Sequence, residues 1–598
     1  MKGESRKSVR PMAHFAKAGC YAALIGLFIG SSVCPAGSQK SSPDNSRLIA
    51  LAAARFPNLT RAERAMLRFS DVENVDRGEI AVSGPSSNRD DSSNDPAHAR
   101  EWDTQREIRA SLIRWLCTDP DAIRLVDPGG IKVLGARIAD GIDISNIRVP
   151  FAITLRRCAI AQRLRLAGAE IPQLDLNGSY TGEVEAEGLN VDHKLSLGDG
   201  FRASGEVDLE NAKIGGDLYC RGGHFNHSAR DMAFWAKGED TAIDAWGAVV
   251  GGDALLVEGF ESDGSVNLDN ATVSFLFCWG GKFFNPHKTA LSASFANLGN
   301  VDLGDEEGTF EANGSVEFLI THVKAAFSVQ NARFMGGAAD KHGLDASGMT
   351  APVLIWHNAT LENGAVLDLG GAQIAFLLDE EKSWPVAGKL MIDGFKYDGF
   401  GSASDATSRL RWIGLNANST DPQPYSQLAQ VLRASGDDAG ANRVLIARED
   451  ARFARYGLVG TLWGGLLKAT IGYGHRPLLA VFWSLAVILI GWGVVRIARS
   501  ARVMRPTWPE NSPRSSDDPY EELNPLLYSI DLFFPFVNFH QEHYWWPDTN
   551  TSGECVILGR RIKFSGRIVR QYLWLQIAAG WLLSAIFLAG VTGLIRSD

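Results

Sequence analysis

Residues 164–191 read LRLAGAEIPQLDLNGSYTGEVEAEGLNV, and this stretch decides the fold. Apolar residues occur there in i, i+2 pairs that restart every five residues: Leu164/Leu166, Ala169/Ile171, Leu174/Leu176, Val184/Ala186 and Leu189/Val191. The pattern matches neither a helical period nor simple strand alternation. Two inward residues per short strand and a corner every five residues predict a parallel β-helix, with about 20 residues per turn and turns stacked about 4.8 Å apart.

A longer repeat overlies this pattern, which runs from about 131 to 400. The segment SGEVDLENAKI at 204–214 returns as DGSVNLDNATV at 263–273, and LYCRGGHF at 218–225 returns as LFCWGGKF at 276–283. A unit of roughly 50–60 residues has therefore been duplicated, as in repeat proteins whose units stack on their neighbours. Gly is also abundant, with 62 in 598 residues, and we expect many of these at the tight corners.

Helical caps are predicted on both sides of the β-helix, which we place at 126–405. The N-terminal cap covers 41–125: Thr60-Arg-Ala-Glu63 is a capping box, and residues 104–117 put apolar side chains on one helical face, namely Ile108, Leu112, Trp115 and Leu116. Between these helices, 80–100 is rich in Gly, Ser, Asn, Asp and Pro and is predicted to be a linker. Residues 420–457 predict an αα-hairpin with its break at Gly436.

Both ends of the chain contain apolar segments. Basic residues ahead of an uncharged stretch predict a signal peptide or signal anchor over 1–36. The stretches 477–495 and 572–595 are long enough to cross about 30 Å of hydrocarbon and define a membrane module over 458–598. Lys and Arg flank the loop between them (498–569), so the positive-inside rule puts this loop in the cytoplasm. The protein is thus expected in a bacterial inner membrane, with the β-helix on the periplasmic side.

Charge and spacing limit the classes of partner. With 59 Lys+Arg against 69 Asp+Glu the net charge is −10, so no nucleic acid is expected as a partner. The lipid bilayer is the partner that the apolar spans require. Gly580 and Ser584 lie four residues apart and form a small-xxx-small face, which leaves a homo-oligomer through the transmembrane helices as an open alternative.

Rungs of the form LxLxxAxI, with GGDLYCRGGHF at 215–225, resemble the pentapeptide-repeat-like β-helix membrane proteins of bacteria, within them the group commonly named membrane-associated oxidoreductase. The resemblance covers about 105–400, and the YGHRP motif at 473–477 is similar to membrane-bound members. It implies a right-handed quadrilateral β-helix with membrane attachment. In some such proteins the paired C-terminal spans resemble a potassium-channel module, but here FFPF at 533–536 stands in place of filter glycines.

The sequence contains no motif for the redox activity that the name of this group suggests. There is no G-x-G-x-x-G between a strand and a helix, no P-loop and no C-x-x-C, so neither a cofactor nor a catalytic residue is predicted. Cys158, Cys220 and Cys278 occupy rung positions and are interpreted as small core residues. A disulfide between adjacent turns and metal binding are the alternatives.

Two further patterns carry candidate chemistry. In His540-Gln-Glu-His543 the histidines share a helix face and Glu542 is positioned to assist a metal-bound water, so His540, Glu542 and His543 are weak metal candidates. The alternative is a polar lip on an aromatic interfacial segment. A second pattern comprises acidic rungs that are either solvated or form a carboxylate ladder able to hydrolyse a glycan: Glu206, Asp208, Glu210, Asp302, Asp305, Glu306 and Glu307.

These observations favour a non-enzymatic protein. The leading hypothesis is a membrane-anchored β-helix scaffold of the bacterial envelope that binds an unidentified protein or envelope polymer. One alternative is a channel-like or transport-related protein with a regulatory β-helix and a re-entrant segment at 520–547. The other is an envelope enzyme, acting on polysaccharide or carrying the redox activity that the resemblance implies.

Overall fold

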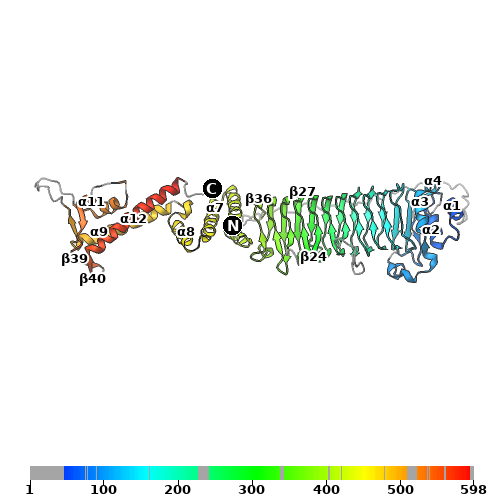
Figure 1. Ribbon diagram of the computed structural model, residues 1–598, viewed down its shortest axis with the longest axis horizontal. Coiled ribbons are helices and arrows are strands. Elements are labelled where there is room, and N and C mark those ends of the chain that lie inside the picture. Colours follow the sequence, from blue (N-terminus) through cyan, green and yellow to red (C-terminus); the bar gives the residue numbers. More distant parts are fainter. Residues whose placement is uncertain are drawn as a thin grey trace, which may run out of the picture. The chain divides into compact units, whose positions relative to one another are not determined.

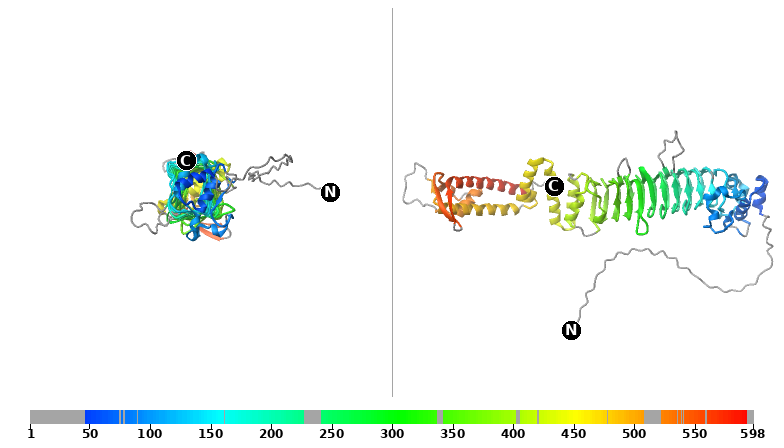
Figure 2. Two further views of the ribbon diagram at one scale, coloured as in Figure 1. Left: turned by 90° about the vertical axis from the view of Figure 1, so that its right-hand side faces the viewer. Right: turned by 90° about the horizontal axis from the view of Figure 1, so that it is seen from below.

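The computed structural model describes residues 46–592, apart from 74–75, 77–78, 89, 161, 227–240, 337–341, 402–404, 419–420, 477, 508–521, 535, 538, 540 and 558–559. The signal segment predicted over 1–36 lies outside these residues. The described chain forms a parallel β-solenoid of about 11 turns with helices flanking it (Figure 1). The turns superpose when the stack is viewed along its length (Figure 2).

The strands of successive turns pair in parallel in four columns. The first column holds β7 (Leu164–Arg165), β11 (Val184–Glu185), β15 (Val207–Asp208), β19 (Thr241–Asp244), β22 (Ser265–Asn267), β24 (Lys282–Ser292), β26 (Phe310–Glu317), β30 (His342–Asp345), β33 (Val366–Asp368) and β35 (Leu390–Met391). The second holds β2 (Glu107–Ile108), β4 (Arg137–Ile138), β6 (Ala159–Ile160), β10 (Tyr180–Thr181), β14 (Arg202–Ala203), β18 (His224–Asn226), β21 (Glu261–Asp263), β29 (Ala332–Phe334) and β32 (Thr360–Leu361), with β24 and β26 passing through both. The third holds β8 (Glu170–Ile171), β12 (Asn190–Val191), β16 (Lys213–Ile214), β27 (His322–Val323) and β36 (Lys396–Phe400). The fourth holds β1 (Ala81–Val82), β3 (Ile131–Leu134), β5 (Ile153–Arg156), β9 (Leu174–Asp175), β13 (Leu195–Ser196), β17 (Leu218–Tyr219) and β28 (Ala326–Gln330). Five longer strands bend from the third column into the fourth, as β36 also does: β20 (Val249–Leu255), β23 (Thr272–Phe277), β25 (Asn297–Leu303), β31 (Thr350–His357) and β34 (Gln373–Asp379).

The five-residue pattern is confirmed as the inward face of these strands. Leu164 and Leu166 are buried, as are Leu174 and Leu176, and Leu164 and Leu174 are in register with Val184 and Leu195 of the next turn. At the corners the backbone turns with positive φ, which is 68° at Gly178 and 65° at Gly188. A residue with a side chain would be strained in that region, which explains the excess of Gly.

A ladder of aromatic rings that the sequence reading missed fills the middle of the solenoid. Six phenylalanines from consecutive turns stack with centroid separations of 5.1–5.6 Å: Phe201, Phe225, Phe260, Phe283, Phe310 and Phe334. All six are at most 1% exposed. The separations match the spacing between turns, so each ring packs against its neighbours above and below.

The longer repeat corresponds to two turns rather than one. Leu218 pairs with Ala254, and Ala254 pairs with Leu276, so the two copies of the LYCRGGHF motif are separated by an intervening turn. Gly215 and Gly251 mark a close approach of adjacent turns, because a Cβ at Gly251 would overlap with the carbonyl oxygen of Gly215. Larger residues there would push the turns apart.

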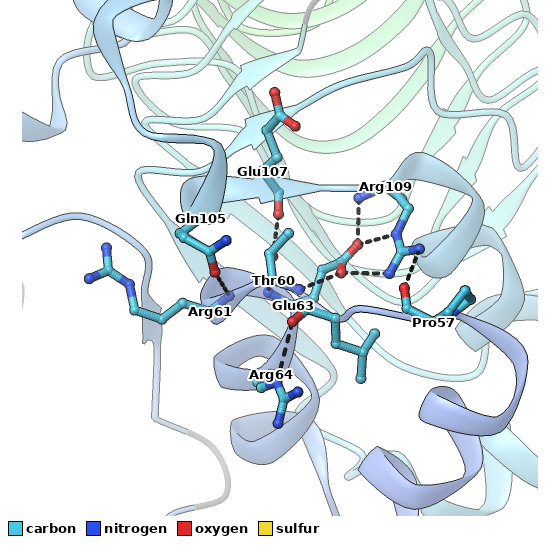
Figure 3. A network of polar contacts seen from close by, with 9 residues as sticks. Pro57, Thr60, Arg61, Glu63, Arg64, Gln105, Glu107 and Arg109 are labelled. Atoms are coloured by element: carbon cyan, nitrogen blue, oxygen red, sulfur yellow. Dashed lines mark hydrogen bonds and ion pairs between the residues drawn. The ribbon is translucent and has the colours of Figure 1, made fainter.

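The N-terminal cap consists of α1 (Arg47–Arg55), α2 (Arg61–Ser70), α3 (Ala110–Thr118) and α4 (Pro120–Leu125). The capping box is confirmed: Glu63 accepts the backbone N–H of Thr60 at 3.0 Å, and Thr60 Oγ1 accepts that of Glu63 at 3.1 Å (Figure 3). Glu63 is fully buried and also accepts hydrogen bonds from Arg109 Nε at 2.7 Å and Nη2 at 2.8 Å. Arg109 thereby ties α2 to the segment that leads from β2 into α3.

Two predictions for this cap are wrong. Ile108 lies in β2, which pairs with β4 of the first turn, and the helix begins only at Ala110 because Arg109 has an extended backbone. Residues 80–100 are not a linker: they carry β1, which pairs with β3, and two 3-10 helices whose N-caps are Asp91 and Asp95. Carboxylates at N-caps satisfy exposed backbone N–H groups, which explains how such a polar stretch is ordered.

The C-terminal cap contains α5 (Ala406–Ile413) and the predicted αα-hairpin, which is confirmed as α6 (Gln423–Ala434) and α7 (Asp438–Ala454). Gly436 forms the break, with φ of 86°. Arg409 of α5 is buried and pairs with Asp379 of β34 at 2.6 and 2.8 Å. One contiguous core of apolar side chains runs from Leu48 to Leu445, so both caps close the solenoid.

The remaining elements form the C-terminal part. They are α8 (Gly457–Ile471), α9 (Leu478–Ser500), β37 (Met504–Pro506), α10 (Pro525–Phe533), α11 (Gln541–Tyr544), β38 (Trp545–Pro547), β39 (Ser552–Ile557), β40 (Arg560–Ser565) and α12 (Gly566–Val591). Two of these helices, α9 and α12, are long and apolar enough to cross a membrane. They coincide with the two predicted spans, each being extended at the end nearer the intervening loop.

Candidate functional site

The predicted metal candidates are only partly described. His540 lies outside the described residues, Glu542 is half-buried in α11, and His543 is exposed. The backbone N–H of Glu542 donates to Asp531 of α10 at 3.2 Å. Within the described part of the chain neither side chain belongs to a group with metal-ligand geometry, and the metal site at 540–543 remains a prediction.

The rung cysteines lie in the core. Cys220 aligns with Leu256, which aligns with Cys278, so an intervening leucine separates the two thiols that are equivalent in the repeat. Both are fully buried, and among the described residues Cys117, Cys158, Cys220 and Cys278 are free thiols. Burial raises the pKa of the Cys158 thiol to about 12, so it stays protonated and unreactive. Packing is therefore the role that the structure gives these cysteines.

Polar residues, most of them acidic, form a column of outward positions along the first column of strands. Residues in register on successive turns are Glu185, Asp208, Asp244, Asn267, Ser292, Glu317, Asp345 and Asp368. We call the surface that they form the acidic face. Its carboxylates accept hydrogen bonds from neutral neighbours: Asn267 donates to Asp244 at 3.0 Å, and Ser315 donates to Glu317 at 2.8 Å.

The adjoining face, on the second column of strands, differs in how its charges are paired. There Glu261 contacts His224 at 3.2 Å and Lys282 at 3.3 Å. Further along, Arg333 contacts Glu311 at 3.2 Å and Glu362 at 3.0 Å. We call this surface the paired face. On the acidic face the ion pairs of the described residues lie at its two ends, where Arg163 and Arg165 contact Glu185 and where His342 contacts Asp345 at 3.4 Å. Between Asp208 and Asp368 no described Lys or Arg forms an ion pair with the column.

The closely spaced carboxyl groups on and beside the acidic face have raised pKa values. Burial, together with the charges of Asp244, Asp208 and Glu183, raises the pKa of Glu206 to about 7. The pKa of Asp244 is raised by burial and by Asp208. Like charges that lie a turn apart repel one another, and a cation placed on this face would relieve that repulsion.

The predicted acidic residues thus divide between surfaces. Asp208 is part of the acidic face, and Glu206 and Glu210 adjoin it along the chain; burial and the charges of Glu187 and Asp208 raise the pKa of Glu210. Asp302 lies instead on the fourth column, in register with Phe277 and Ser328. Asp305, Glu306 and Glu307 lie in the exposed turn after β25, where Asp305 Oδ1 accepts the backbone N–H groups of Glu307 and Gly308.

At the far end of the acidic face lies a group that the sequence reading missed. His342, Asp345 and Asp368 offer three ligand atoms that all lie within 4.8 Å of one another. Burial raises the pKa of Asp345, but hydrogen bonds from His342 and Ser347 outweigh it, so the net shift is downward. The pKa of Asp368 is raised by burial and by Asp345. The sequence does contain a pattern that predicts this column. In each rung the residue between the two inward positions points outward, and it is an acid in Ile243-Asp-Ala245 and Leu367-Asp-Leu369.

Compared with protein-family models, with curated proteins and with solved structures, the chain gives no match.

Proposed function

We propose that this protein is a membrane-anchored scaffold of the bacterial envelope, in which α9 and α12 cross the membrane and the β-solenoid presents flat faces to a partner. The packed interior supports a binding role, because apolar side chains fill the solenoid along its described length. A partner would therefore bind on the outer surface of the solenoid.

The observation that carries the proposal is the contrast between two neighbouring faces of one solenoid. Acids on the paired face have basic partners, as Glu261 has Lys282. Among the described residues, Asp208, Asp244 and Glu317 of the acidic face have no such partner, which leaves a strip of negative potential along the middle of this face. A partner with clustered positive charge, such as a Lys-rich protein segment, complements this strip.

A defined cationic probe tests the proposal. Full-length protein in lipid nanodiscs is titrated with a fluorescent oligolysine peptide, and the neutralised variant Glu206→Gln/Asp208→Asn is compared with wild type. At pH 8.5, where Glu206 with its pKa of about 7 is ionised, we expect binding that weakens with added salt and that becomes about tenfold weaker in this variant, since two charges next to the bound cation are lost.

The matched control removes the same number of acids from the paired face, as Glu261→Gln/Glu311→Gln. Because these carboxylates are already neutralised by their partners, the affinity should change less than about threefold. Equal losses in both double variants would refute the acidic face as the binding surface.

A further inference from the structure

The segment between α9 and α12 contains a hairpin whose two arms are joined by polar contacts. At its base the backbone N–H of Asn524 donates to Gln541 Oε1 at 3.1 Å. Further in, the buried carboxylate of Asp531 accepts the backbone N–H groups of Phe539 at 2.7 Å and Glu542 at 3.2 Å. Backbone polar groups that would be costly in hydrocarbon therefore have partners within the segment.

The first arm, α10, packs deep between the two candidate spans. Ser529 Oγ donates to the carbonyl oxygen of Ile488 in α9 at 2.7 Å, and Gln576 Nε2 of α12 donates to Ser529 Oγ at 2.8 Å. A Cβ at Gly580 of α12 would overlap with the carbonyl oxygen of Phe533. The small residue of the predicted helix-packing face is thus used for contact within the chain.

The depth of these contacts in the membrane can be counted along α9 and α12 from the residues at the membrane surface. Arg499 of α9 donates to the carbonyl oxygen of Leu523 at 2.7 Å, and Arg570 of α12 lies 5.6 Å from the ring of Trp546. Arg and Trp at this level are typical of the headgroup region. Ile488 precedes Arg499 by eleven residues, which at 1.5 Å per residue is about 16 Å, or about half of the hydrocarbon thickness.

The tip of the hairpin is apolar and exposed. Phe536 is 81% exposed, and its ring lies 6.3 Å from that of Trp581, which follows Arg570 by eleven residues in α12. Val537 and Phe539 beside it are also more than one third exposed. A turn with these side chains is unfavourable in water, whereas hydrocarbon at mid-membrane depth accommodates them.

We infer that the described residues between 523 and 547 belong to a re-entrant hairpin, which enters the bilayer from the side of the 498–569 loop, turns near Phe536 at about mid-membrane depth and returns to the same side. The partner of its tip is lipid hydrocarbon. This inference rests on the proposed membrane anchoring, in which α9 and α12 cross.

Site-directed spin labelling of the full chain in nanodiscs tests the hairpin. Labels are placed one at a time at Phe536→Cys (tip), His543→Cys (base) and Leu582→Cys, an exposed position near the middle of α12, in a background in which Cys20, Cys34 and Cys555 are replaced by Ser. Collision rates with oxygen, which concentrates in hydrocarbon, and with a water-soluble nickel chelate report depth. We expect the chelate to reach the Phe536 label at least tenfold less than the His543 label, and oxygen to reach it as readily as the Leu582 label.

The other outcomes separate the two proposals. Chelate access at Phe536 equal to that at His543, with Leu582 protected, would overturn the hairpin and leave the anchoring intact. A Phe536 label shielded from both reagents would show that protein, and not lipid, covers the tip, which also overturns the inference. Chelate access at Leu582 itself would refute the anchoring.

Discussion

Replacing Phe283 with alanine removes one ring from the middle of the aromatic ladder. The side chain is 1% exposed and lies between Phe260, at 5.1 Å, and Phe310, at 5.2 Å between centroids. Phe→Ala in a packed core costs about 3–5 kcal/mol. Because ring contacts are lost on both sides, we expect about 4 kcal/mol. Phe284 supplies the matched control, since the next residue is the same amino acid but 48% exposed.

Hydrogen exchange followed by mass spectrometry on the full-length protein in nanodiscs measures this cost locally. A loss of about 4 kcal/mol corresponds to exchange about 10³-fold faster wherever opening of these turns limits it. The effect should be largest in the turns between Phe260 and Phe310 and should decrease along the stack, because each turn contacts only its neighbours. Phe284→Ala should accelerate exchange less than about tenfold. Equal effects of the two variants, or a uniform effect along the solenoid, would refute the ladder as a source of local stability.

Three further predictions concern buried charges. Arg409→Ala leaves Asp379 buried without its cation and should cost about 3–5 kcal/mol, whereas Arg409→Ala/Asp379→Ala should recover part of the loss; chemical denaturation of both variants checks this. Arg109→Ala, which strands the Glu63 carboxylate in the N-terminal cap, should cost about 3 kcal/mol and accelerate hydrogen exchange in α2, with unchanged exchange refuting the role of the pair. Because the pKa of Glu206 is raised to about 7 from an ordinary 4.5, the folded protein retains a proton that the unfolded chain releases, so stability should fall as pH rises from 4.5 to 7. Glu206→Gln should flatten that fall, as measured by melting temperature against pH, and an unchanged slope would contradict the shift.

The solenoid follows from residue spacing because its determinants are local. Pairs such as Leu174/Leu176 point inward wherever the chain turns every five residues, and stacking of identical turns does the rest. The capping box at Thr60 and the break at Gly436 were equally predictable, since each depends on a few neighbouring residues. The helix predicted at Ile108 is wrong because pairing of β2 with β4, 30 residues further along the chain, overrides the local helical pattern.

The candidate sites were less predictable because they depend on register between turns. Asp208 and Asp244 are in register although 36 residues separate them, whereas 23 residues separate Glu185 from Asp208. For the same reason the sequence left open a disulfide between rung cysteines of adjacent turns, whereas Leu256 separates Cys220 from Cys278. The contacts of α10 with both spans could not be predicted either, because they join residues far apart in the sequence: Gln576 and Ser529 are 47 residues apart.

The most direct test of the scaffold proposal is the topology of the full chain. Two reporter proteins are fused in turn after residue 421 and after residue 510. Alkaline phosphatase is active only outside the cytoplasm. Green fluorescent protein fluoresces in the cytoplasm and does not fluoresce when it is exported by the general secretory route. The proposal predicts phosphatase activity without fluorescence at 421, next to the solenoid, and fluorescence without phosphatase activity at 510, in the basic loop. Fluorescence at 421 would contradict a solenoid that meets its partner in the envelope.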